Sequence, residues 1–577
     1  MPVHNGDIAG AFEEIADLLE IGDANPFRVR AYRNAARVIG ELQLDVAAVI
    51  RRGEALPKLP GIGEDLSGKI REIATTGRCS LLERLRKSVP PAVTDLLKIP
   101  GLGPKRVKAL YHDLDVQTLE QLLRAARDGR IRALPGFGEK TELNILQAVE
   151  ARLLKPRRYK LATAAQYAEA LAAYLRQARG ARQVVIAGSL RRMRETVGDI
   201  DILATAAATN DLIERFARYA EVKEVLSQGS TRSSVMLKSG MQVDLRVVPQ
   251  ESYGAALHYF TGSKAHNIAV RRLAQERGLK LNEYGVFKGE KRVAGGTEES
   301  VFAGVGLPWI PPELREDRGE IEAARAGRLP RLIELADLKG DLHAHTKWSD
   351  GYHSVREMAE AAKAHGLAYL AITDHSRRLT AAHGLDPERL RRQLDEIERT
   401  EVPGITLLKG IEVDILEDGA LDLPDSILKQ LDVVIAAVHS RFSLSRERQT
   451  ERILRALDHP LVMMLAHPLG RLIETREPYD VDMLKIIRKA AARGRFLELN
   501  AHPERLDLLD THCRMAKDEG VLVSINSDAH SAQQFDNLKY GIGQARRGWL
   551  EKRDVLNTRT LAELRTLIGK SRARAAA

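Results

Sequence analysis

The chain has 577 residues, which suggests about four domains, and 44% of its residues are hydrophobic, an ordinary fraction for a globular protein. No apolar run approaches the length of a membrane span, no signal-peptide pattern opens the chain, and the two cysteines provide no disulfide framework. These features exclude a membrane-spanning or disulfide-stabilised secreted class, and we expect a cytoplasmic protein. The net charge of +10 favours an anionic partner, with nucleic acid as the first candidate.

Residues 1–90 are helical in pattern, and a repeat begins within them. Three segments read apolar-Pro-Gly-apolar-Gly at the start of a predicted helix, at 59–70, 99–110 and 134–146. Paired glycines allow a tight hairpin whose backbone amides bind a phosphate at a helix amino terminus without contacting a base. One copy would be an ordinary turn, but three copies form the helix-hairpin-helix pattern. They predict sequence-independent DNA binding through Gly61, Gly63, Gly101, Gly103, Gly136 and Gly138.

A second pattern, QVVIAGSLRRMRETVGDIDIL, spans residues 183–203 and contains two carboxylates. Asp199 and Asp201 alternate along a predicted strand and therefore share a face, and the strand 242–248 adds Asp244. Three carboxylates on neighbouring strands repel one another unless cations lie between them. We therefore predict two Mg²⁺ ions at this triad, which would activate a 3′-hydroxyl and stabilise a leaving pyrophosphate. The Asp-x-Asp pair alone is weak evidence, because such pairs are frequent on surface strands.

A triphosphate site is predicted beside these aspartates. Gly188 allows the backbone to approach the phosphates, Ser189 can donate to them, and Arg192 can bind them as a fork. This block resembles the nucleotidyltransferase palm of family X DNA polymerases, and the likeness continues through YFTGS at 259–263. An aromatic pair in a core would explain the two rings but not the whole motif. The resemblance implies nucleotide binding by Tyr259, Phe260, Gly262 and Asn267, and DNA contacts by Arg246 and Arg271.

Lys69 lies one helical turn beyond the first glycine pair, where lyase domains of this family carry a Schiff-base lysine that removes 5′-deoxyribose phosphate. A desolvated lysine is suited to such chemistry. The position four residues earlier, basic in the eukaryotic pattern, is Asp65. This carboxylate should raise the pKa of Lys69 and oppose a 5′-phosphate. Two interpretations stay open, a lyase nucleophile and a plain DNA contact.

From residue 340 onward, seven short apolar strands alternate with segments of helical periodicity. This alternation predicts a parallel, barrel-like sheet with its chemistry at the carboxyl ends of the strands. Nine potential metal ligands fall at those ends, namely His343, His345, Asp350, His375, Glu412, His439, His467, Asp528 and His530. One zinc takes four ligands, so two or three metals are needed, with Glu412 or Asp528 as a bridge. The absence of sulfur from the set favours catalytic phosphoester hydrolysis over a structural site.

This carboxyl-terminal region resembles the PHP domain (polymerase and histidinol phosphatase), and all nine ligand positions of that family are occupied. The resemblance implies a trinuclear centre, and we expect three Mn²⁺ or Zn²⁺ ions. We expect Glu412 to bridge two of them. The further assignment places His343 and His345 on one metal of that pair, His439 and His467 on the other, and Asp350, His375 and His530 on the third.

The expected fold is multidomain α/β. It comprises a lyase-like helical domain (1–90), fingers with two helix-hairpin-helix motifs (91–155), an α+β palm (156–250), a thumb (251–310), a linker (311–339) and a distorted (β/α)7 PHP barrel (340–570). The basic tail 569–577 is expected to be disordered. Nearly the whole chain thus resembles bacterial family X DNA polymerases with a fused PHP domain.

That resemblance implies a monomeric repair polymerase that fills gaps with deoxynucleoside triphosphates on gapped or nicked DNA. It also implies a metal-dependent 3′–5′ exonuclease in the barrel, and leaves an abasic-site endonuclease open. The alternative is a DNA-end scaffold with a silent palm, whose barrel hydrolyses small phosphate monoesters. The intact carboxylate triad argues against the alternative.

Overall fold

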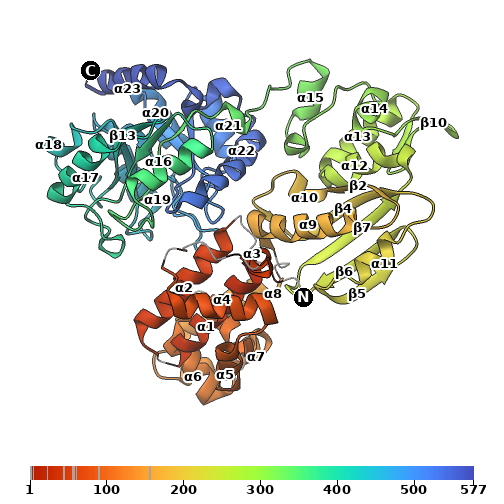
Figure 1. Cartoon of the computed structure of the whole chain (residues 1–577), viewed down its shortest axis with the longest axis horizontal. Helices are drawn as coiled ribbons and strands as arrows, with labels where there is room; N and C mark the ends of the chain where they lie inside the picture. The colour runs from red at the N-terminus through yellow and green to blue at the C-terminus, as the bar shows by residue number, and fades with distance from the viewer. Residues whose placement is uncertain are drawn as a thin grey trace. The chain divides into compact units, whose positions relative to one another are not determined.

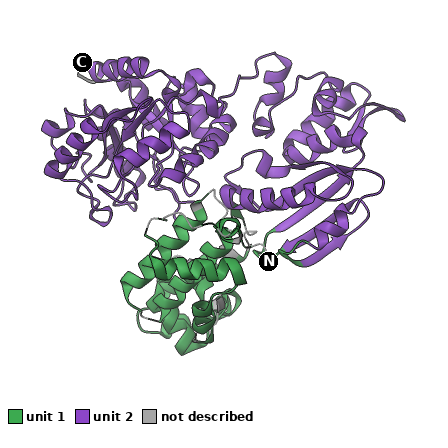
Figure 2. Cartoon of the chain, viewed as in Figure 1, with its two compact units in different colours: residues 1–159, 219–223, 237–241 green, residues 160–218, 224–236, 242–577 purple. Residues whose placement is uncertain are grey.

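The computed structural model describes residues 3, 5–22, 24–42, 46–52, 54, 59, 61–88, 91–99, 101–154 and 158–576. The predicted boundary at 155/156 lies outside these residues, as do Pro60 and Pro100 of the first two repeats. The chain divides into two compact units, 1–159 with 219–223 and 237–241, and 160–218 with 224–236 and 242–577 (Figure 2).

The first unit is helical over its described residues up to 154 (Figure 1). Its helices are α1 (Asn5–Ile21), α2 (Pro26–Glu41), α3 (Val46–Arg51), α4 (Glu64–Thr76), α5 (Ser80–Ser88), η1 (Pro91–Lys98), α6 (Pro104–Leu114), α7 (Leu119–Arg127), η2 (Ile131–Ala133) and α8 (Glu139–Leu154). Ile8, Phe12, Ile15 and Leu19 recur every three or four residues along α1 and are buried. Burial of one such apolar face is what holds these helices together.

The palm is a five-stranded sheet in the order β2-β4-β7-β6-β5. Its elements are β1 (Tyr159–Lys160), α9 (Leu161–Arg176), β2 (Ala181–Ile186), α10 (Gly188–Arg191), β3 (Thr196–Val197), β4 (Asp199–Ala206), α11 (Leu212–Ala217), β5 (Val222–Gln228), β6 (Arg232–Leu237) and β7 (Gln242–Val248). β4 pairs with β7 in parallel, whereas β2 with β4 and β6 with β7 are antiparallel. The central strands β4 and β7 carry the predicted carboxylates.

The thumb follows as helices packed around a three-stranded sheet, in the order β10-β9-β8. Its elements are η3 (Gln250–Ser252), α12 (Tyr253–Thr261), α13 (Lys264–Glu276), β8 (Lys280–Asn282), β9 (Gly285–Lys288), β10 (Lys291–Ala294), α14 (Glu298–Gly304), η4 (Pro312–Leu314) and α15 (Glu320–Arg325). Val270, Val286 and Phe302 are among the buried residues of its core.

The segment 311–339, predicted as a linker, contributes to this core, and that prediction is wrong for much of its length. Leu314, Ile321 and Leu332 join the buried cluster of the thumb. The charges that suggested an exposed segment are partly buried as well, because Arg315 pairs with Glu298 in the protein interior. The prolines and charges of this segment suggested that it is exposed, because the residues that it packs against and pairs with lie elsewhere in the chain.

Residues 340–576, all of which the structure describes, form a barrel of seven parallel strands in sequential order. The strands are β11 (Gly340–Asp341), β12 (Tyr369–Ile372), β13 (Thr406–Asp414), β14 (Val433–Ala437), β15 (Met464–Leu465), β16 (Phe496–Asn500) and β17 (Val523–Asn526). An isolated parallel bridge from Ala344 to Ala529 brings the first and last strands together, so the barrel is nearly closed. This confirms the predicted barrel-like sheet.

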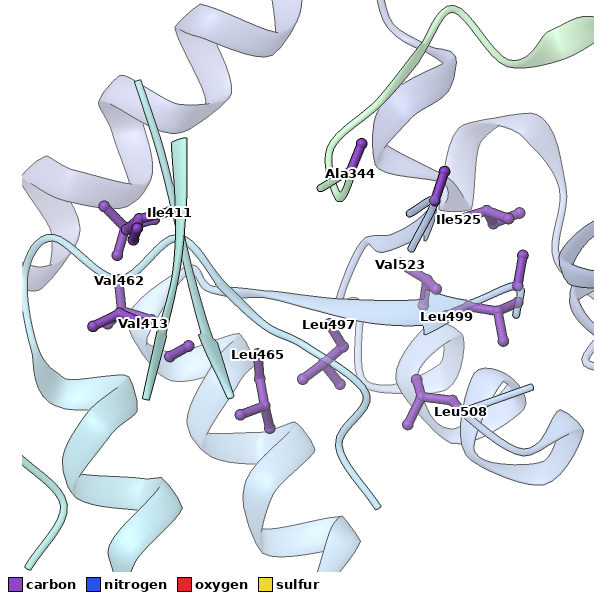
Figure 3. Close-up of a cluster of buried hydrophobic side chains, with 14 of the residues drawn as sticks. Ala344, Ile411, Val413, Val462, Leu465, Leu497, Leu499, Leu508, Val523 and Ile525 are labelled. Atoms are coloured by element: carbon purple, nitrogen blue, oxygen red, sulfur yellow. The ribbon is translucent and has the colours of Figure 1, made fainter. Parts of the chain in front are cut away.

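Helices link most of these strands, as the alternating pattern predicted. They are η5 (Leu335–Asp337), α16 (Val355–Ala364), η6 (Thr380–Ala382), α17 (Pro387–Arg399), α18 (Asp425–Leu428), α19 (Arg446–Asp458), α20 (Met483–Arg493), α21 (Asp510–Asp518), η7 (Ala532–Asn537), α22 (Leu538–Arg547), η8 (Lys552–Asp554), η9 (Leu556–Thr558) and α23 (Leu561–Ala576). Strand residues such as Ile411, Leu465, Leu497 and Ile525 contribute to the core (Figure 3).

The tail was predicted to be disordered, but residues 569–576 belong to α23. Ser571 accepts a hydrogen bond from Arg495 at 3.0 Å, and Arg572 donates to the carbonyl of Leu431 at 2.7 Å. The basic composition of the tail did not indicate these contacts, because the residues that bond to the tail lie elsewhere in the barrel. Among the described residues, none of the helices has the length and apolarity that a bilayer crossing requires.

Candidate active sites

The predicted ligands of the barrel gather at the carboxyl-terminal edge of its sheet. His343 and His345 follow β11, Asp350 lies in the loop beyond them, His375 follows β12, Glu412 lies near the end of β13, His439 follows β14, His467 follows β15, and Asp528 and His530 follow β17. Parallel strands end at one edge of a barrel, so residues far apart in the chain converge there. The structure brings all nine side chains into one connected cluster.

Glu412 lies at the centre of this cluster with its carboxylate buried. Its Oε1 is 2.8 Å from Nε2 of His467 and 3.2 Å from Nε2 of His439. Its Oε2 is 2.7 Å from Nδ1 of His375 and 3.5 Å from Nε2 of His343. A carboxylate whose two oxygens face different sets of imidazoles has the arrangement of a bridging ligand in a multinuclear site.

The donor atoms form three overlapping groups, each within 4.8 Å; His439 is grouped with His375 and Glu412 rather than with His467, which belongs to none of the three. The groups are His345 with Asp350, His375 and His530; His343 with His345 and Asp528; and His375 with Glu412 and His439. The expected third set is thus together, and so is the expected pair of His343 and His345. His345 and His375 each belong to two groups, so the metal that each serves stays a prediction.

The residues present fit divalent cations. Nδ1 of His345 and Nδ1 of His467 are buried without a hydrogen bond to any described residue, although buried polar atoms are nearly always bonded. Burial raises the pKa of the Glu412 carboxyl, but His375, His439 and His343 outweigh burial and hold that pKa well below its usual range. A deprotonated carboxylate among imidazoles is the donor set that such ions require.

Glu498 on β16 orients two of the ligands and was missed by the sequence analysis. Its Oε1 lies 2.7 Å from Nδ1 of His343, and its Oε2 accepts a hydrogen bond from the backbone N–H of His467 at 2.8 Å. Asn526 donates to the same carboxylate at 2.9 Å. A fixed second ring nitrogen sets the tautomer and orientation of a ligating histidine. The available signal was an acidic residue in the apolar strand FLELN.

Asp374, which directly precedes the predicted ligand His375, was not assigned a role by the sequence analysis, and the structure indicates one. It accepts hydrogen bonds from the backbone N–H and the hydroxyl of Thr346, at 2.8 Å and 2.6 Å, and from the N–H of Ser349 at 3.1 Å. This fixes the loop between His345 and Asp350. Asp374 therefore helps to position these two predicted ligands.

In the palm, Asp201 on β4 lies in register with Asp244 on β7, and Asp199 lies two residues before Asp201 on the same face. Burial and the charges of Asp199 and Asp244 raise the pKa of Asp201 to about 7. Asp244 accepts hydrogen bonds from Ser234 and, at 3.1 Å, from Nε2 of Gln242. Repulsion of this kind is relieved by cations, so the triad fits the predicted metal site.

Two glycines of the predicted nucleotide site are required by close packing. Gly188 has φ +65°, and a Cβ there would lie 2.1 Å from Oδ2 of Asp201. A Cβ at Gly262 would lie 2.4 Å from Oδ1 of Asn267. Gly188 therefore makes room for the carboxylate of Asp201, a reason that the sequence analysis did not find. Ser189 lies beside Gly188 in the short helix α10.

Arg192, the predicted triphosphate ligand, is engaged within the protein. Its Nε donates to Oε1 of Glu316 at 3.0 Å, and its Nη1 donates to the carbonyl of Thr261 at 2.7 Å. No local pattern indicated Glu316 as a partner, because it lies in the segment predicted as linker.

The YFTGS motif forms a compact cluster at the end of α12. The rings of Tyr259 and Phe260 pack edge to face with centroids 5.0 Å apart. The guanidinium of Arg271 lies 5.2 Å from the centroid of Tyr259, and that of Arg246 lies 5.3 Å from the centroid of Phe260. Asn267 donates to the carbonyl of Tyr259 at 2.7 Å. Within this motif, the predicted nucleotide-binding residues therefore contact the predicted DNA-binding residues Arg246 and Arg271.

The three hairpins of the first unit have the same turn. In each, a backbone N–H bonds to the carbonyl three residues earlier, with Ile62 to Leu59 at 3.2 Å, Leu102 to Ile99 at 3.0 Å and Phe137 to Leu134 at 3.1 Å. The first glycine of each pair requires a positive φ, which is 65° at Gly61, 86° at Gly101 and 81° at Gly136.

The second glycine of each pair precedes a helix and leaves its approach open. A Cβ at Gly63, Gly103 or Gly138 would meet no atom within 4 Å. Among the residues that the structure describes, no contact explains these glycines, whereas a phosphate approaching a helix amino terminus would. The second hairpin is followed by two cations, Lys105 and Arg106, the third by Glu139 and Lys140, and the first by the acidic pair Glu64 and Asp65.

Lys69 forms an ion pair with Asp65, as the sequence suggested. Burial lowers the pKa of Lys69, but the hydrogen bond with Asp65 and the proximity of Tyr32 raise it above its ordinary value. The predicted direction of the pKa change is confirmed. A protonated amine is a poor nucleophile, so this arrangement does not favour Schiff-base chemistry.

Comparisons with known proteins place these features in context. A Helix-hairpin-helix domain model matches residues 3–79, and a SAM-like Helix-hairpin-helix tandem matches 93–151. A DNA polymerase beta thumb model matches 256–316, and a PHP domain model matches 341–502.

Relatives match the whole chain or part of it. The protein named DNA polymerase/3′-5′ exonuclease PolX from Bacillus subtilis (strain 168) is 39% identical over 576 residues, covering 99% of this chain and 100% of that protein. Proteins described by the words "Probable phosphatase" match a smaller part. One from Thermoanaerobacter sp. (strain X514) is 33% identical over 230 residues, or 38% of this chain and 89% of its own. One from Acetivibrio thermocellus is 32% identical over 199 residues, or 33% of this chain and 78% of its own.

Proposed function

Because the chain belongs to the family X DNA polymerases with helix-hairpin-helix domains, a polymerase beta thumb and a carboxyl-terminal PHP domain, we propose that it is both a DNA polymerase and a 3′–5′ exonuclease. The observation that carries the proposal is the presence of two separate clusters of metal-ligand residues in one chain. One is the carboxylate triad of the palm, and the other is the nine-residue cluster of the barrel.

In the polymerase site, Asp199, Asp201 and Asp244 hold two Mg²⁺ ions, which supply charge neutralisation for an attacking 3′-hydroxyl and a leaving pyrophosphate. Ser189 and Arg192 bind the triphosphate. The substrates are deoxynucleoside triphosphates and a DNA primer. The raised pKa of Asp201 supports the assignment, because it marks a carboxylate for which a nearby cation is favourable.

In the exonuclease site, the nine ligands hold three Mn²⁺ or Zn²⁺ ions, which supply a nucleophile from water and neutralise the scissile phosphate. Glu412 would hold two of the ions, and Glu498 orients His343 through its Nδ1. The distances on both oxygens of Glu412 support the bridging role. Cleavage at abasic sites is a further activity that this donor set would allow.

DNA is held by its phosphates at the three hairpins, and the preferred substrate is gapped or nicked duplex. This preference suits short-gap filling in base excision repair. We propose that the protein acts as a monomer, and a cytoplasmic location stays a prediction. The open space at Gly103 and the neighbouring cations support phosphate binding at the second hairpin most strongly.

One experiment tests both activities. A gapped duplex with a labelled primer is incubated with the full-length protein and Mg²⁺ or Mn²⁺, with and without deoxynucleoside triphosphates. We expect extension when nucleotides are present and shortening of the primer from its 3′ end when they are absent. Failure to extend or shorten the primer, together with hydrolysis of a small phosphate monoester, would favour a DNA-end scaffold with phosphatase activity.

A further inference from the structure

The palm loop that follows Gly188 and Ser189 packs directly on helix α22 of the barrel. Met193 has φ +54° and contacts α22 where Gly543 leaves space, because a Cβ at Gly543 would lie 2.5 Å from Cε of Met193. At the end of the same helix, Nη1 of Arg547 donates to the backbone carbonyl of Arg192 at 2.9 Å. The barrel therefore supports the loop that carries the proposed triphosphate ligands.

A chain of buried charges extends this contact. Oε1 of Glu316 accepts from Nε of Arg192 at 3.0 Å and from Nη1 of Arg547 at 2.9 Å. Arg547 is fixed on its other side by Asp510, whose Oδ2 accepts from Nη2 at 2.8 Å. The side chains of Arg547 and Glu316 are only 3% and 9% exposed, so solvent screens this interaction weakly. Two guanidinium groups thus bond to one carboxylate oxygen, and Nη1 of the more exposed Arg194 lies 3.6 Å from it.

We propose that Glu316 and Arg547 are positioning residues for nucleotide binding. This inference rests on the proposed role of Arg192 as a triphosphate ligand. Glu316 holds Arg192 when no nucleotide is present, and the triphosphate competes with Glu316 for the guanidinium. When Arg192 turns to the triphosphate, Arg547 remains on Glu316 and balances its charge.

The contribution of Arg547 follows from the cost of an unpaired buried charge. If Arg192 were the sole cation on Glu316, its release would leave a buried carboxylate without a counterion, which is strongly unfavourable. Arg547 is already bonded to the same oxygen and is anchored by Asp510, so it lowers that cost. The polymerase site is therefore completed by a residue from the barrel.

The test measures the Kd of the correct deoxynucleoside triphosphate for the full-length protein bound to gapped DNA, with a dideoxy-terminated primer that prevents reaction. Glu316→Gln should lower this Kd by roughly three- to tenfold, because Arg192 is released from a competing carboxylate. Arg547→Gln should raise it, because Glu316 then keeps Arg192 as its one buried cation, and the exposed Arg194 at 3.6 Å compensates only in part. The double variant should resemble Glu316→Gln. In turnover, KM should follow Kd, while kcat should change by less than about twofold.

Glu313→Gln is the matched control, because Glu313 pairs with the neighbouring Arg546 at 2.7 Å but has no contact with Arg192. It should leave the Kd unchanged. Arg192→Ala tests the proposed function separately, and an unaltered Kd in that variant would overturn the role of Arg192 itself. Weakened nucleotide binding in Arg192→Ala without tightening in Glu316→Gln would overturn the present inference alone. Should Arg547→Gln fail to fold, the sign of the Glu316→Gln effect decides, because a merely structural residue would weaken binding when replaced.

Discussion

Asp201 on β4 lies directly opposite Asp244 on β7 in a parallel pair, which brings two carboxylates to one level of the palm sheet. Burial and the charges of Asp199 and Asp244 raise the pKa of Asp201 to about 7. Side chains that raise one another's proton affinity in this way also create a favourable place for divalent ions.

The first prediction follows from that arrangement. Replacing Asp199 and Asp201 by alanine should reduce nucleotide addition by at least about a thousandfold, because the proposed metal site is removed. DNA binding and 3′ shortening should persist, since hairpins and barrel are unaltered. Primer extension and shortening on one labelled gapped substrate measure both. Extension near the wild-type rate would contradict the assignment of the triad.

The second prediction concerns the hairpins. Gly103→Val should weaken binding to all DNA sequences alike and lower the salt slope of log K by about one, because one phosphate contact is lost. Gly103 is a cleaner position than Gly101, because its φ of −86° is open to other residues. Gly138→Val, beside Glu139, should have a smaller effect. Anisotropy titrations at several salt concentrations provide the measurement, and a change in sequence preference would count against phosphate contacts.

The third prediction concerns the buried ion pairs of the thumb. Glu298 accepts hydrogen bonds from Arg191 at 2.8 Å and pairs with the fully buried Arg315. Glu298→Gln should lower the free energy of unfolding by about 3–5 kcal/mol, because Arg315 is left buried without a counterion. The neighbouring Glu299 is exposed, so Glu299→Gln is the matched control and should change little.

The pH dependence of this pair has a defined sign. Burial raises the pKa of Glu298, but Arg191 and Arg315 outweigh burial and hold that pKa below its ordinary value. A carboxylate with a depressed pKa stabilises the fold above its ordinary pKa, and that stability is lost as the pH falls below it. In urea unfolding between pH 7 and pH 3, the free energy of unfolding should therefore fall less steeply with decreasing pH in Glu298→Gln than in wild type. Equal slopes would show that Glu298 is not the group responsible.

The fourth prediction addresses the lyase interpretation of Lys69. Asp65→Asn removes the partner that raises the pKa of Lys69, so more of the neutral amine should be present near neutral pH. The yield of a borohydride-trapped adduct with 5′-deoxyribose-phosphate DNA should then rise several-fold, and its increase with pH should begin at a lower pH. Glu64→Gln, which changes an exposed neighbour, is the control. No trapping in either protein would leave Lys69 as a DNA contact.

The sequence predicted those parts of the sites that depend on local pattern. The predicted ligands of the barrel could be found because every barrel strand except β16 ends at one or more of them, and parallel topology alone brings such ends together. The carboxylate triad could be predicted because Asp199 and Asp201 alternate on one strand. In both cases the position along an element determines the position in space.

The remaining features depend on contacts between distant segments, for which one sequence has no local signal. Glu316 lies more than a hundred residues from Arg192, and its charge suggested an exposed linker rather than a buried partner. Glu498 supports His343 from a strand without a ligand of its own. The overlap of ligand groups at His345 and His375 reflects side-chain orientation, which periodicity does not determine.

The last prediction tests the centre of the barrel. Glu412 has histidines on both oxygens, at 2.8 Å from His467 and 2.7 Å from His375, so its loss removes negative charge from between two proposed metal positions. Glu412→Ala should therefore lose about two metals per chain and all 3′–5′ exonuclease activity, while nucleotide addition persists because the palm triad is separate. His365 and His383 belong to none of the ligand groups, so His365→Ala and His383→Asn are controls that should retain the full metal content. Native mass spectrometry counts the metals, independently of activity. A Glu412→Ala protein that keeps its full metal complement and still shortens 3′ ends would show that Glu412 is not a ligand.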